Sequence, residues 1–386
     1  MSITHCDVAI IGGGPVGAAL AIALQDNDLN VVLLEARESE INTTDPRSLA
    51  LSYGTRLLLQ RLHAWDAIPN VSPIKTIEIT QKHSPGHTTL RAGELNVSEM
   101  GYVLPYTALH AALQKSLQRS DVHCLYGAAV SDLHSTLEHT TLTYTHQGKE
   151  RTLTARLAVV AEGGKLLEAS HPPQITDYGQ SGIIAHVTST QPDNSVAFER
   201  FTSQGPMALL PYMDGYELVL TAAHDKAQEM LAWDDATFLR YLQDHFGDRV
   251  GTFTGVGKRD CYPLRLKRAP DLTFPHTVLI GNAAQTLHPV AGQGFNMGIR
   301  DAWELAQVIL DSAPENIGSA AMCVAYRKSR RIDRNAGIRF TDGLVRLFSN
   351  DLPLLGHMRS AALTLLDCIP PVKKFVAKRM MFGANG

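Results

Sequence analysis

Apolar and polar residues near the start of the chain alternate in the order strand, turn, helix, strand. Residues 7–11 (DVAII) form a short β-rich run, residues 12–14 are three glycines, and residues 18–24 are rich in the helix formers Ala and Leu. A second apolar run, residues 31–35 (VVLLE), is typical of a buried strand. Two strands joined in this way pair in parallel through a right-handed crossover, so the pattern predicts a parallel sheet.

The rest of the chain divides into helical and strand-rich stretches. Helical spacing is found at residues 52–63, 106–119, 234–246 and 295–311, and the last seventy-odd residues are mostly helical. Short strands fill residues 122–161, and the last of them is expected to rejoin the first sheet. Alternating strands from about 171 to 275 predict a separate antiparallel sheet, and a buried strand at 278–280 returns the chain to the first domain.

These patterns predict an α/β fold with two interleaved domains. A Rossmann-like dinucleotide-binding domain with a parallel sheet and a helical C-terminal part comprises residues 1–73, 103–170 and 276–386. A smaller substrate domain with an antiparallel sheet comprises residues 74–102 and 171–275.

Composition excludes several classes of protein. Of the 386 residues, 35 are Lys or Arg and 38 are Asp or Glu, and a net charge of −3 argues against a nucleic-acid partner. The five scattered cysteines fit neither a disulfide framework nor a zinc site, so we expect a reducing cytosol and no metal. The uncharged stretch 8–25 resembles a membrane span, but Asp7, the absence of a basic flank and the glycines favour a strand, a turn and a helix.

The first turn carries a dinucleotide-binding motif. Gly12, Gly14 and Gly17 form G-x-G-x-x-G between a strand and a helix, and Glu35 ends the next strand 23 positions after Gly12. The glycines allow a tight turn, the approach of a pyrophosphate to the helix N-terminus and close helix packing, while the acidic residue accepts from a ribose hydroxyl. This motif alone leaves NAD and FAD open.

A second glycine-rich turn favours FAD. The segment 281–301 (GNAAQTLHPVAGQGFNMGIRD) has a strand end at Gly281 and then Gly292 and Gly294 at a helix start, where backbone N–H groups are unpaired. A second helix N-terminus far along the chain suits a ligand that extends across the domain, as the isoalloxazine of FAD would.

Five segments together resemble the flavin-dependent aromatic hydroxylases, and within them the ubiquinone-biosynthesis hydroxylases. They are GGGPVGAALA near the N-terminus, DPRSLALS at 45–52, FERFTSQGPMALLPYMDG at 198–215, residues 281–301, and YRKSRRIDRNAGIRFTDGLVRLF at 326–348. The resemblance implies that Gly12, Gly14, Gly17 and Glu35 hold the ADP half of FAD. It places Arg47 beside the flavin and Gly281 with Asn282 at the ribityl chain, and it implies a flavin-lining turn of Pro289, Gly292, Gln293, Gly294 and Asn296.

The same resemblance implies an FAD-dependent monooxygenase that hydroxylates a polyprenylated phenol in ubiquinone biosynthesis through a flavin hydroperoxide. O2 is then the co-substrate, and NAD(P)H or another reductant supplies electrons. His288, in the flavin-facing turn, is the candidate base for the phenol, although any one of sixteen histidines is more often structural; Tyr212 is a weaker candidate.

Two other functions stay open. One is an FAD-dependent reductase of a prenyl or quinone substrate. The other is a non-catalytic flavin-binding subunit of a biosynthetic assembly, because Glu162-Gly163 replaces the Asp-Gly of many relatives and the Ser and Arg that usually follow are missing.

The C-terminal segment LTLLDCIPPVKKFVAKRMMFG mixes apolar residues with Lys373, Lys374, Lys378 and Arg379. This mixture suits either an anionic membrane surface or a terminal helix docked on the body with a solvated basic face. We therefore expect a cytoplasmic protein, with peripheral attachment to the inner membrane as the variant that a bilayer-borne substrate favours.

Overall fold

The first sheet contains the dinucleotide motif. The computed structural model describes the chain apart from residues 1–3, 39–44, 83, 290–291, 349–352 and 386. Its first sheet has the order β18-β19-β11-β1-β2-β8, with β10 and β9 added beside β11, and the pairs β19–β11, β11–β1, β1–β2 and β2–β8 are parallel. The strands are β1 His5–Ile11, β2 Val31–Glu35, β8 His123–Tyr126, β9 Ala128–Ser135, β10 Thr140–His146, β11 Lys149–Val160, β18 Thr273–Phe274 and β19 Thr277–Leu279. Helices α1 (Pro15–Ala23), α3 (Tyr106–Leu117) and α7 (Gln293–Leu310) pack with this sheet around one large apolar core.

The second sheet has the order β20-β17-β12-β15-β14-β13-β5-β6, with β16 beside β12. Its strands are β5 Thr76–Gln81, β6 His87–Arg91, β12 Gln174–Ser189, β13 Val196–Thr202, β14 Gly205–Tyr212, β15 Gly215–Ala223, β16 Phe253–Val256, β17 Asp260–Arg268 and β20 Gln285–Thr286. The predicted separate antiparallel sheet is confirmed, and it contains one parallel pair, β5 with β13. Chain from before residue 100 thus adds two edge strands to a sheet made mostly from residues 174–268.

One face of the second sheet is covered by α5 (His224–Ala232) and α6 (Asp235–Phe246). Asp234 caps α6 by accepting from the Thr237 N–H at 2.7 Å, as the acidic pair at its start predicted. Helix α5 was not predicted. Ile183, Met207 and Leu218 point into the core beneath these helices, so the alternate residues of the same strands point to the opposite face.

A small third sheet, β3-β7-β4, lies between these two parts of the molecule. It contains β3 Ser48–Ser52, β4 Ser72–Ile74 and β7 Gly101–Pro105, and β14 packs against it. Ile74 and Val103 share a core with Leu210 and Tyr212 of β14. The opposite face of the second sheet, which we call its inner face, therefore packs against this small sheet.

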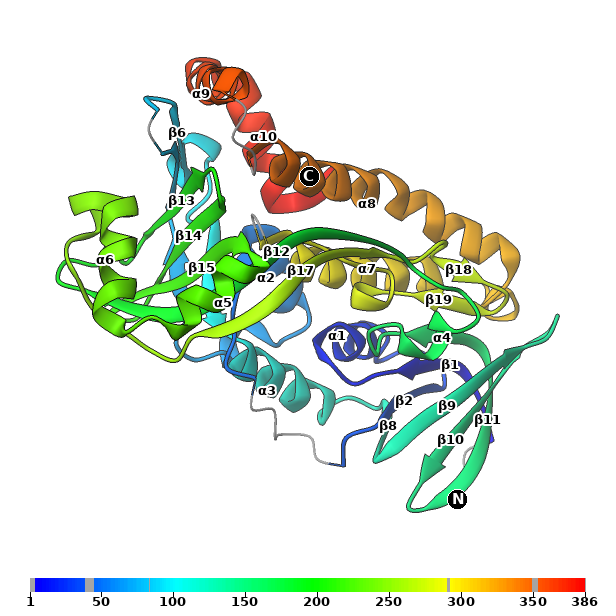
Figure 1. The fold of residues 1–386 in the computed structure, drawn as a ribbon. Coiled ribbons are helices and arrows are strands. Elements are labelled where there is room, and N and C mark those ends of the chain that lie inside the picture. Colours follow the sequence, from blue (N-terminus) through cyan, green and yellow to red (C-terminus); the bar gives the residue numbers. More distant parts are fainter. Residues whose placement is uncertain (1–3, 39–44, 83, 290–291, 349–352, 386) are drawn as a thin grey trace.

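Long helices complete the fold (Figure 1). Helix α8 (Ala320–Phe348) runs along α7, and α9 (Pro353–Cys368) and α10 (Pro370–Phe382) lie beside β6 and the short helix α2 (Tyr53–Arg61). The remaining elements are α4 Lys165–Glu168 and the 3₁₀ turns η1 Trp65–Ala67, η2 Ala92–Leu95, η3 Gly247–Val250, η4 Gly281–Ala283, η6 Pro314–Asn316 and η7 Gly383–Asn385. In the part of the chain that the structure describes, no helix is both long and apolar enough to cross a bilayer. The predicted α/β class with C-terminal helices is confirmed, while the two-domain boundaries stay a prediction.

Candidate FAD and substrate site

The three glycines of the first motif have different structural roles. Gly12 has φ +108°, and a Cβ there would come within 2.8 Å of the Glu162 backbone N. A Cβ at Gly17 would lie 2.0 Å from the Gly12 carbonyl oxygen. Gly14, the N-cap of α1, has φ −64° and ψ 174°, and a Cβ there would meet nothing within 4 Å. Gly12 and Gly17 are therefore needed for the packing of the fold itself, whereas Gly14 borders open space beside the first N–H groups of α1.

Glu35 is held as a carboxylate beside this loop. Its Oε2 accepts from the Gly13 N–H at 2.6 Å, and its Oε1 accepts from the backbone N and Nε of Arg37 at 3.0 and 2.8 Å. Burial would raise the pKa of Glu35, but the hydrogen bonds from Arg37 and Gly13 outweigh it and keep the pKa below its ordinary value. The carboxylate is thus ionised and aimed at the loop.

Gln114, a buried residue of α3, contacts the same loop. Gln114 donates to the Gly13 carbonyl at 3.0 Å, and the Tyr126 hydroxyl donates to Gln114 Oε1 at 2.8 Å. Sequence analysis missed Gln114 and Arg37. Arg37 stands two residues after Glu35 and could have been suspected, but nothing in the pattern of α3 distinguishes Gln114.

The second turn is fixed by a buried ion-pair network. The Gly281 N–H and the Gln285 amide donate to Asp301 of α7 at 3.1 and 2.8 Å. Arg330 of α8, which is 1% exposed, donates to the same carboxylate at 2.7 Å and pairs with Asp333 at 2.9 Å. The start of the turn is therefore tied to α7 and α8, and Asn282 is left exposed beside it.

At the start of α7, Gly292 has φ +60° and a Cβ there would lie 3.1 Å from Ala50 Cβ, so the turn approaches β3 closely. Asn296 accepts from the Ser52 N–H at 2.8 Å and donates to the Ala50 and Gly292 carbonyls at 3.0 and 2.7 Å. Gln293 donates to the Met380 carbonyl at 3.3 Å. Through these hydrogen bonds to backbone groups, Asn296 and Gln293 connect the start of α7 to β3 and α10. A Cβ at Gly294 would come within 4 Å only of Leu287, at 3.9 Å.

Arg47 connects the first domain to the second sheet. Its Nη2 lies 2.5 Å from Asp45 Oδ2, and its guanidinium carbon lies 5.9 Å from the ring centres of both Tyr106 and Tyr262. Tyr262 belongs to β17 and pairs with Gly182 of β12, on the sheet face away from α5 and α6. Arg47 is itself exposed, so it borders the space between the two sheets.

His288 is only 1% exposed, and burial lowers its pKa to about 4. Its ring meets that of Tyr178 edge-on at 5.6 Å, and the Tyr178 hydroxyl donates to Asp342 of α8 at 3.0 Å. Pro289 is exposed. At neutral pH the imidazole is therefore uncharged, and it is a weaker proton acceptor than an ordinary histidine.

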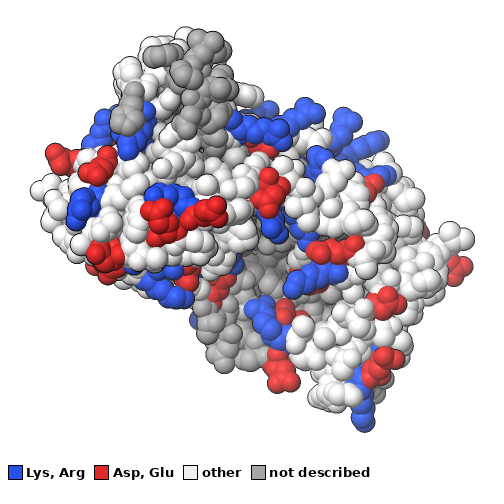
Figure 2. All heavy atoms as spheres, viewed as in Figure 1, with Lys and Arg blue, Asp and Glu red and all other residues white. Residues whose placement is uncertain are grey.

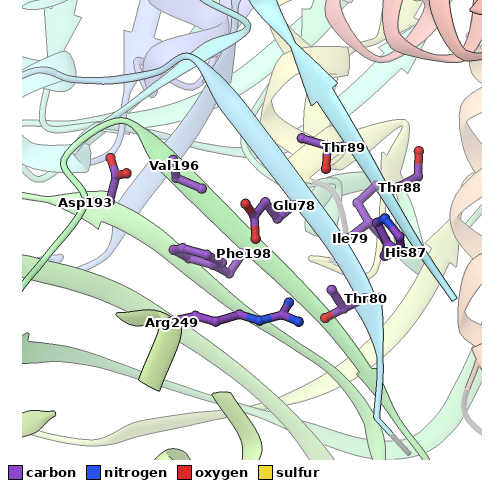
Figure 3. Close-up of a pocket in the computed structure, with 10 residues that line it drawn as sticks. All are labelled: Glu78, Ile79, Thr80, His87, Thr88, Thr89, Asp193, Val196, Phe198 and Arg249. Atoms are coloured by element: carbon purple, nitrogen blue, oxygen red, sulfur yellow. The ribbon is translucent and has the colours of Figure 1, made fainter. Parts of the chain in front are cut away.

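A cavity of about 520 Å³ lies on the other side of the second sheet (Figure 3). Glu78 of β5, Phe198 of β13 and Arg249 of η3 line it, and Phe198 also packs into the core beneath α6. This cavity is thus separated by the sheet from the glycine turns.

The residues present fit FAD. The open space beside the N-terminus of α1 suits a pyrophosphate, and the ionised Glu35 suits a ribose. The second helix start, at Gly292, suits an extended ring system. The roles of the individual residues toward FAD stay predictions.

Comparison with known proteins agrees with this fit. The model of the FAD binding domain family matches residues 5–332. The chain belongs to this family. The FAD-binding protein is 31% identical to the ubiquinone hydroxylase UbiL of Rhodospirillum rubrum, over 97% of this chain and 89% of that one. It is 28% identical to the 3-demethoxyubiquinol 3-hydroxylase of Escherichia coli, over 96% of this chain and 97% of that one.

Among solved structures, the FAD-binding protein has the fold of the p-nitrophenol 4-monooxygenase PnpA of Pseudomonas putida. The TM-score is 0.79 at 16% identity, over 99% of this chain and 100% of that one. The expected family and enzyme class are confirmed: the protein is an FAD-dependent monooxygenase, and flavin monooxygenases use NAD(P)H and O2.

Proposed function

We propose that this monooxygenase hydroxylates a polyprenylated phenol in ubiquinone biosynthesis. The observation that carries the proposal is that Arg47 and His288, the residue before the second glycine turn, contact Tyr262 and Tyr178 of the second sheet. Tyr262 lies on the inner face of this sheet, the face directed away from α5 and α6. The full-length similarity to ubiquinone hydroxylases supports this substrate class. Within that group, the resemblance of the sequence motifs suggests 2-octaprenyl-6-methoxyphenol hydroxylase as a candidate counterpart.

Each part of the site has a proposed task. The N–H groups at the start of α1 bind the pyrophosphate of FAD, and Glu35 accepts from a ribose hydroxyl. The positive end of α7 would stabilise the negative charge that collects on the flavin when it is reduced. Bound FAD supplies the chemistry that transfers one oxygen atom of O2 to the ring.

The inner face of the second sheet suits the substrate. Cross-strand neighbours Ala208, Val219 and Ile184 are apolar, and Leu210 continues this face. A prenyl tail gains about 0.8 kcal/mol for each methylene that leaves water, so an apolar wall favours this substrate and excludes water from the reacting ring. We place the phenol between this face and the turn that leads into α7.

Labelled oxygen tests the function. The purified enzyme with FAD and NADPH is given ¹⁸O2 and a geranylated phenol in detergent, and we expect a product with one added ¹⁸O atom by mass spectrometry. Reduced substrate without label would indicate the reductase, and no turnover with any reductant would indicate a non-catalytic flavin-binding subunit. A Gly14→Val variant controls for chemistry by free flavin.

The C-terminal helices supply a surface for contact with a bilayer. Leu365, Ile369, Val372 and Phe375 are 59, 37, 46 and 58% exposed, and Lys374 and Lys378 are exposed beside them. Figure 2 shows further Lys and Arg side chains along the edge where α8 runs. Exposed apolar side chains flanked by cations are typical of binding to an anionic lipid surface, and we propose peripheral attachment there.

Vesicle sedimentation tests this attachment. Wild type is expected to sediment with phosphatidylglycerol-containing vesicles and less with purely zwitterionic ones, and Phe375→Glu should weaken the binding. Met213→Glu is the matched control, because Met213 is also 58% exposed but lies in the β14–β15 hairpin. Equal sedimentation of the two variants would contradict the proposal.

A further inference from the structure

The carboxyl group of Glu199 lies in the second sheet on the inner face. Along β13, Phe198 points into the core beneath α6, whereas Ala197 packs with Leu210 and Tyr212, and Phe201 packs with Tyr178 and Val345. Side chains alternate along a strand, so Glu199 shares the face of Ala197 and Phe201. Its direct partner across the pair with β14 is Ala208.

Glu199 is half-buried, so its side chain keeps accessible surface on this face. Within the described residues, no hydrogen bond or ion pair joins this carboxyl to another group. A carboxyl group that keeps accessible surface on a mainly apolar face and has no protein partner is able to accept a hydrogen bond from a ligand that binds there.

The position of Glu199 relates it to the second glycine turn. Phe201, two residues farther along the same face and about 7 Å away at the usual rise of a strand, shares a cluster with Tyr178. The Tyr178 ring contacts that of His288, just before the turn into α7. Glu199 therefore lies on the same face of the sheet as Phe201, whose cluster includes the tyrosine that contacts His288.

We propose that Glu199 is a catalytic residue that accepts the proton of the substrate's phenolic hydroxyl. This inference rests on the proposed function. The oxygen–hydrogen bond of the phenol breaks, its proton goes to the carboxylate, and the electron pair stays on the phenolate, which makes the ring carbons more reactive toward an electrophilic oxygen atom. When the ring has been hydroxylated and has regained its aromaticity, the carboxylic acid returns the proton to the same oxygen.

The overall reaction balances without a net change at Glu199. One ring C–H, one O2, one hydride from NAD(P)H (two electrons and one proton) and one proton from solvent give one ring C–OH and one water. Burial raises the pKa of Glu199 to about 8, which brings the basicity of the carboxylate closer to that of a phenolate than an exposed glutamate would be. His288, the histidine predicted for this role, has a pKa of about 4 and almost no accessible surface.

Other titratable groups on this face must be separated from Glu199 in any pH measurement. Burial raises the pKa of Tyr178, and that of His288 is low, so neither changes charge near pH 8. His186 of β12, farther along the face, has a raised pKa because Glu217 and Asp214 accept from its ring. A pH profile of wild type alone therefore does not identify the group, and an altered substrate is needed.

The test uses two phenols and three variants. The probes are a geranylated phenol and its ring-fluorinated counterpart, whose hydroxyl is already ionised at the assay pH and needs no base. Glu199→Gln removes the base, Glu199→Asp keeps a carboxyl, and Glu78→Gln is the matched control, because Glu78 lies on the adjacent strand β5 and faces the cavity on the other side of the sheet. Flavin content and hydroxylated product are measured for each protein.

We expect Glu199→Gln to retain FAD but to form product from the ordinary phenol about 10²-fold more slowly or worse, with recovery to near wild type on the fluorinated phenol. Glu199→Asp should fall between, and Glu78→Gln should behave as wild type. Equal loss on both phenols, or no loss on either, overturns the role of Glu199.

Two further outcomes are informative. If wild type hydroxylates neither phenol, the proposed function fails and the role of Glu199 fails with it. If Glu199→Gln loses its flavin, the pH dependence of kcat/KM of the wild-type enzyme is measured instead. It should change near pH 8 for the ordinary phenol and stay constant for the fluorinated one. The same pH profile for both phenols overturns the proposal.

Discussion

The contrast between Gly14 and Gly17 provides the sharpest test of the FAD site. A Cβ at Gly14 meets nothing within 4 Å, and its φ of −64° and ψ of 174° are open to any L-residue, so Gly14→Val should leave the apoprotein fold intact. The new side chain fills the space beside the N-terminus of α1. Loss of a charge-assisted hydrogen bond, about 1.5–3 kcal/mol, and of the helix-dipole contribution, about 0.3–1 kcal/mol, together weaken FAD binding by about 3 kcal/mol. This corresponds to roughly 100-fold in Kd.

Gly17→Ala should behave in the opposite way. Its Cβ would lie 2.0 Å from the Gly12 carbonyl oxygen, so the helix must move away from β1 and the apoprotein should melt at a lower temperature. Apoproteins of both variants are titrated with FAD by flavin fluorescence and are melted without it. Wild-type affinity in Gly14→Val, or an apoprotein of that variant as unstable as Gly17→Ala, would refute the assignment of open space at Gly14 to the pyrophosphate.

Three further results are expected. Glu35→Ala should weaken FAD by about 1–3 kcal/mol in the same titration, and Arg37→Ala less, because Arg37 only orients the carboxylate. The pKa of His288 is lower in the folded chain than the ordinary 6.5, so its contribution to stability is present above pH 6.5 and is lost as the pH falls toward 4. In a plot of melting temperature against pH, His288→Gln should therefore have a smaller slope on the acid side. An unchanged slope would contradict the burial of a neutral imidazole. Arg330→Met leaves the Asp301 carboxylate buried without its cation, so the free energy of unfolding in urea should fall by about 3–5 kcal/mol. FAD should also be lost, because Asp301 would no longer fix Gly281. A decrease below about 1 kcal/mol would show that the network does not hold the turn.

Local chain geometry made much of the nucleotide half predictable. The strand at residues 31–35, ending at Glu35, matches β2, and the turn between β1 and α1 lies where the glycine spacing places it. A glycine motif, a strand and a following helix are adjacent in the chain, so a short stretch of sequence contains the interactions that define them. The capped start of α6 was predictable for the same reason.

Only the tertiary structure decided which side chains remain available to a ligand. Gln293 and Asn296 belong to a flavin-lining motif by resemblance, but the fold directs them to backbone groups of α10 and β3, which lie far away in sequence. Likewise, β5 joins β13 in parallel across more than a hundred residues, and no local pattern specifies a partner at that separation.

Glu199 illustrates the same limit. In sequence it is a charged residue next to Arg200 in a short strand, and a charged residue in a strand usually indicates a solvent-facing position. Burial of that face depends on the first domain, the small sheet and α8, all of which come from other parts of the chain. Sequence by itself determined the strand–turn–helix–strand unit with its dinucleotide motif, because the interactions that define that unit are local. The choice between a structural and a chemical role for each polar side chain required the packing of distant elements against one another.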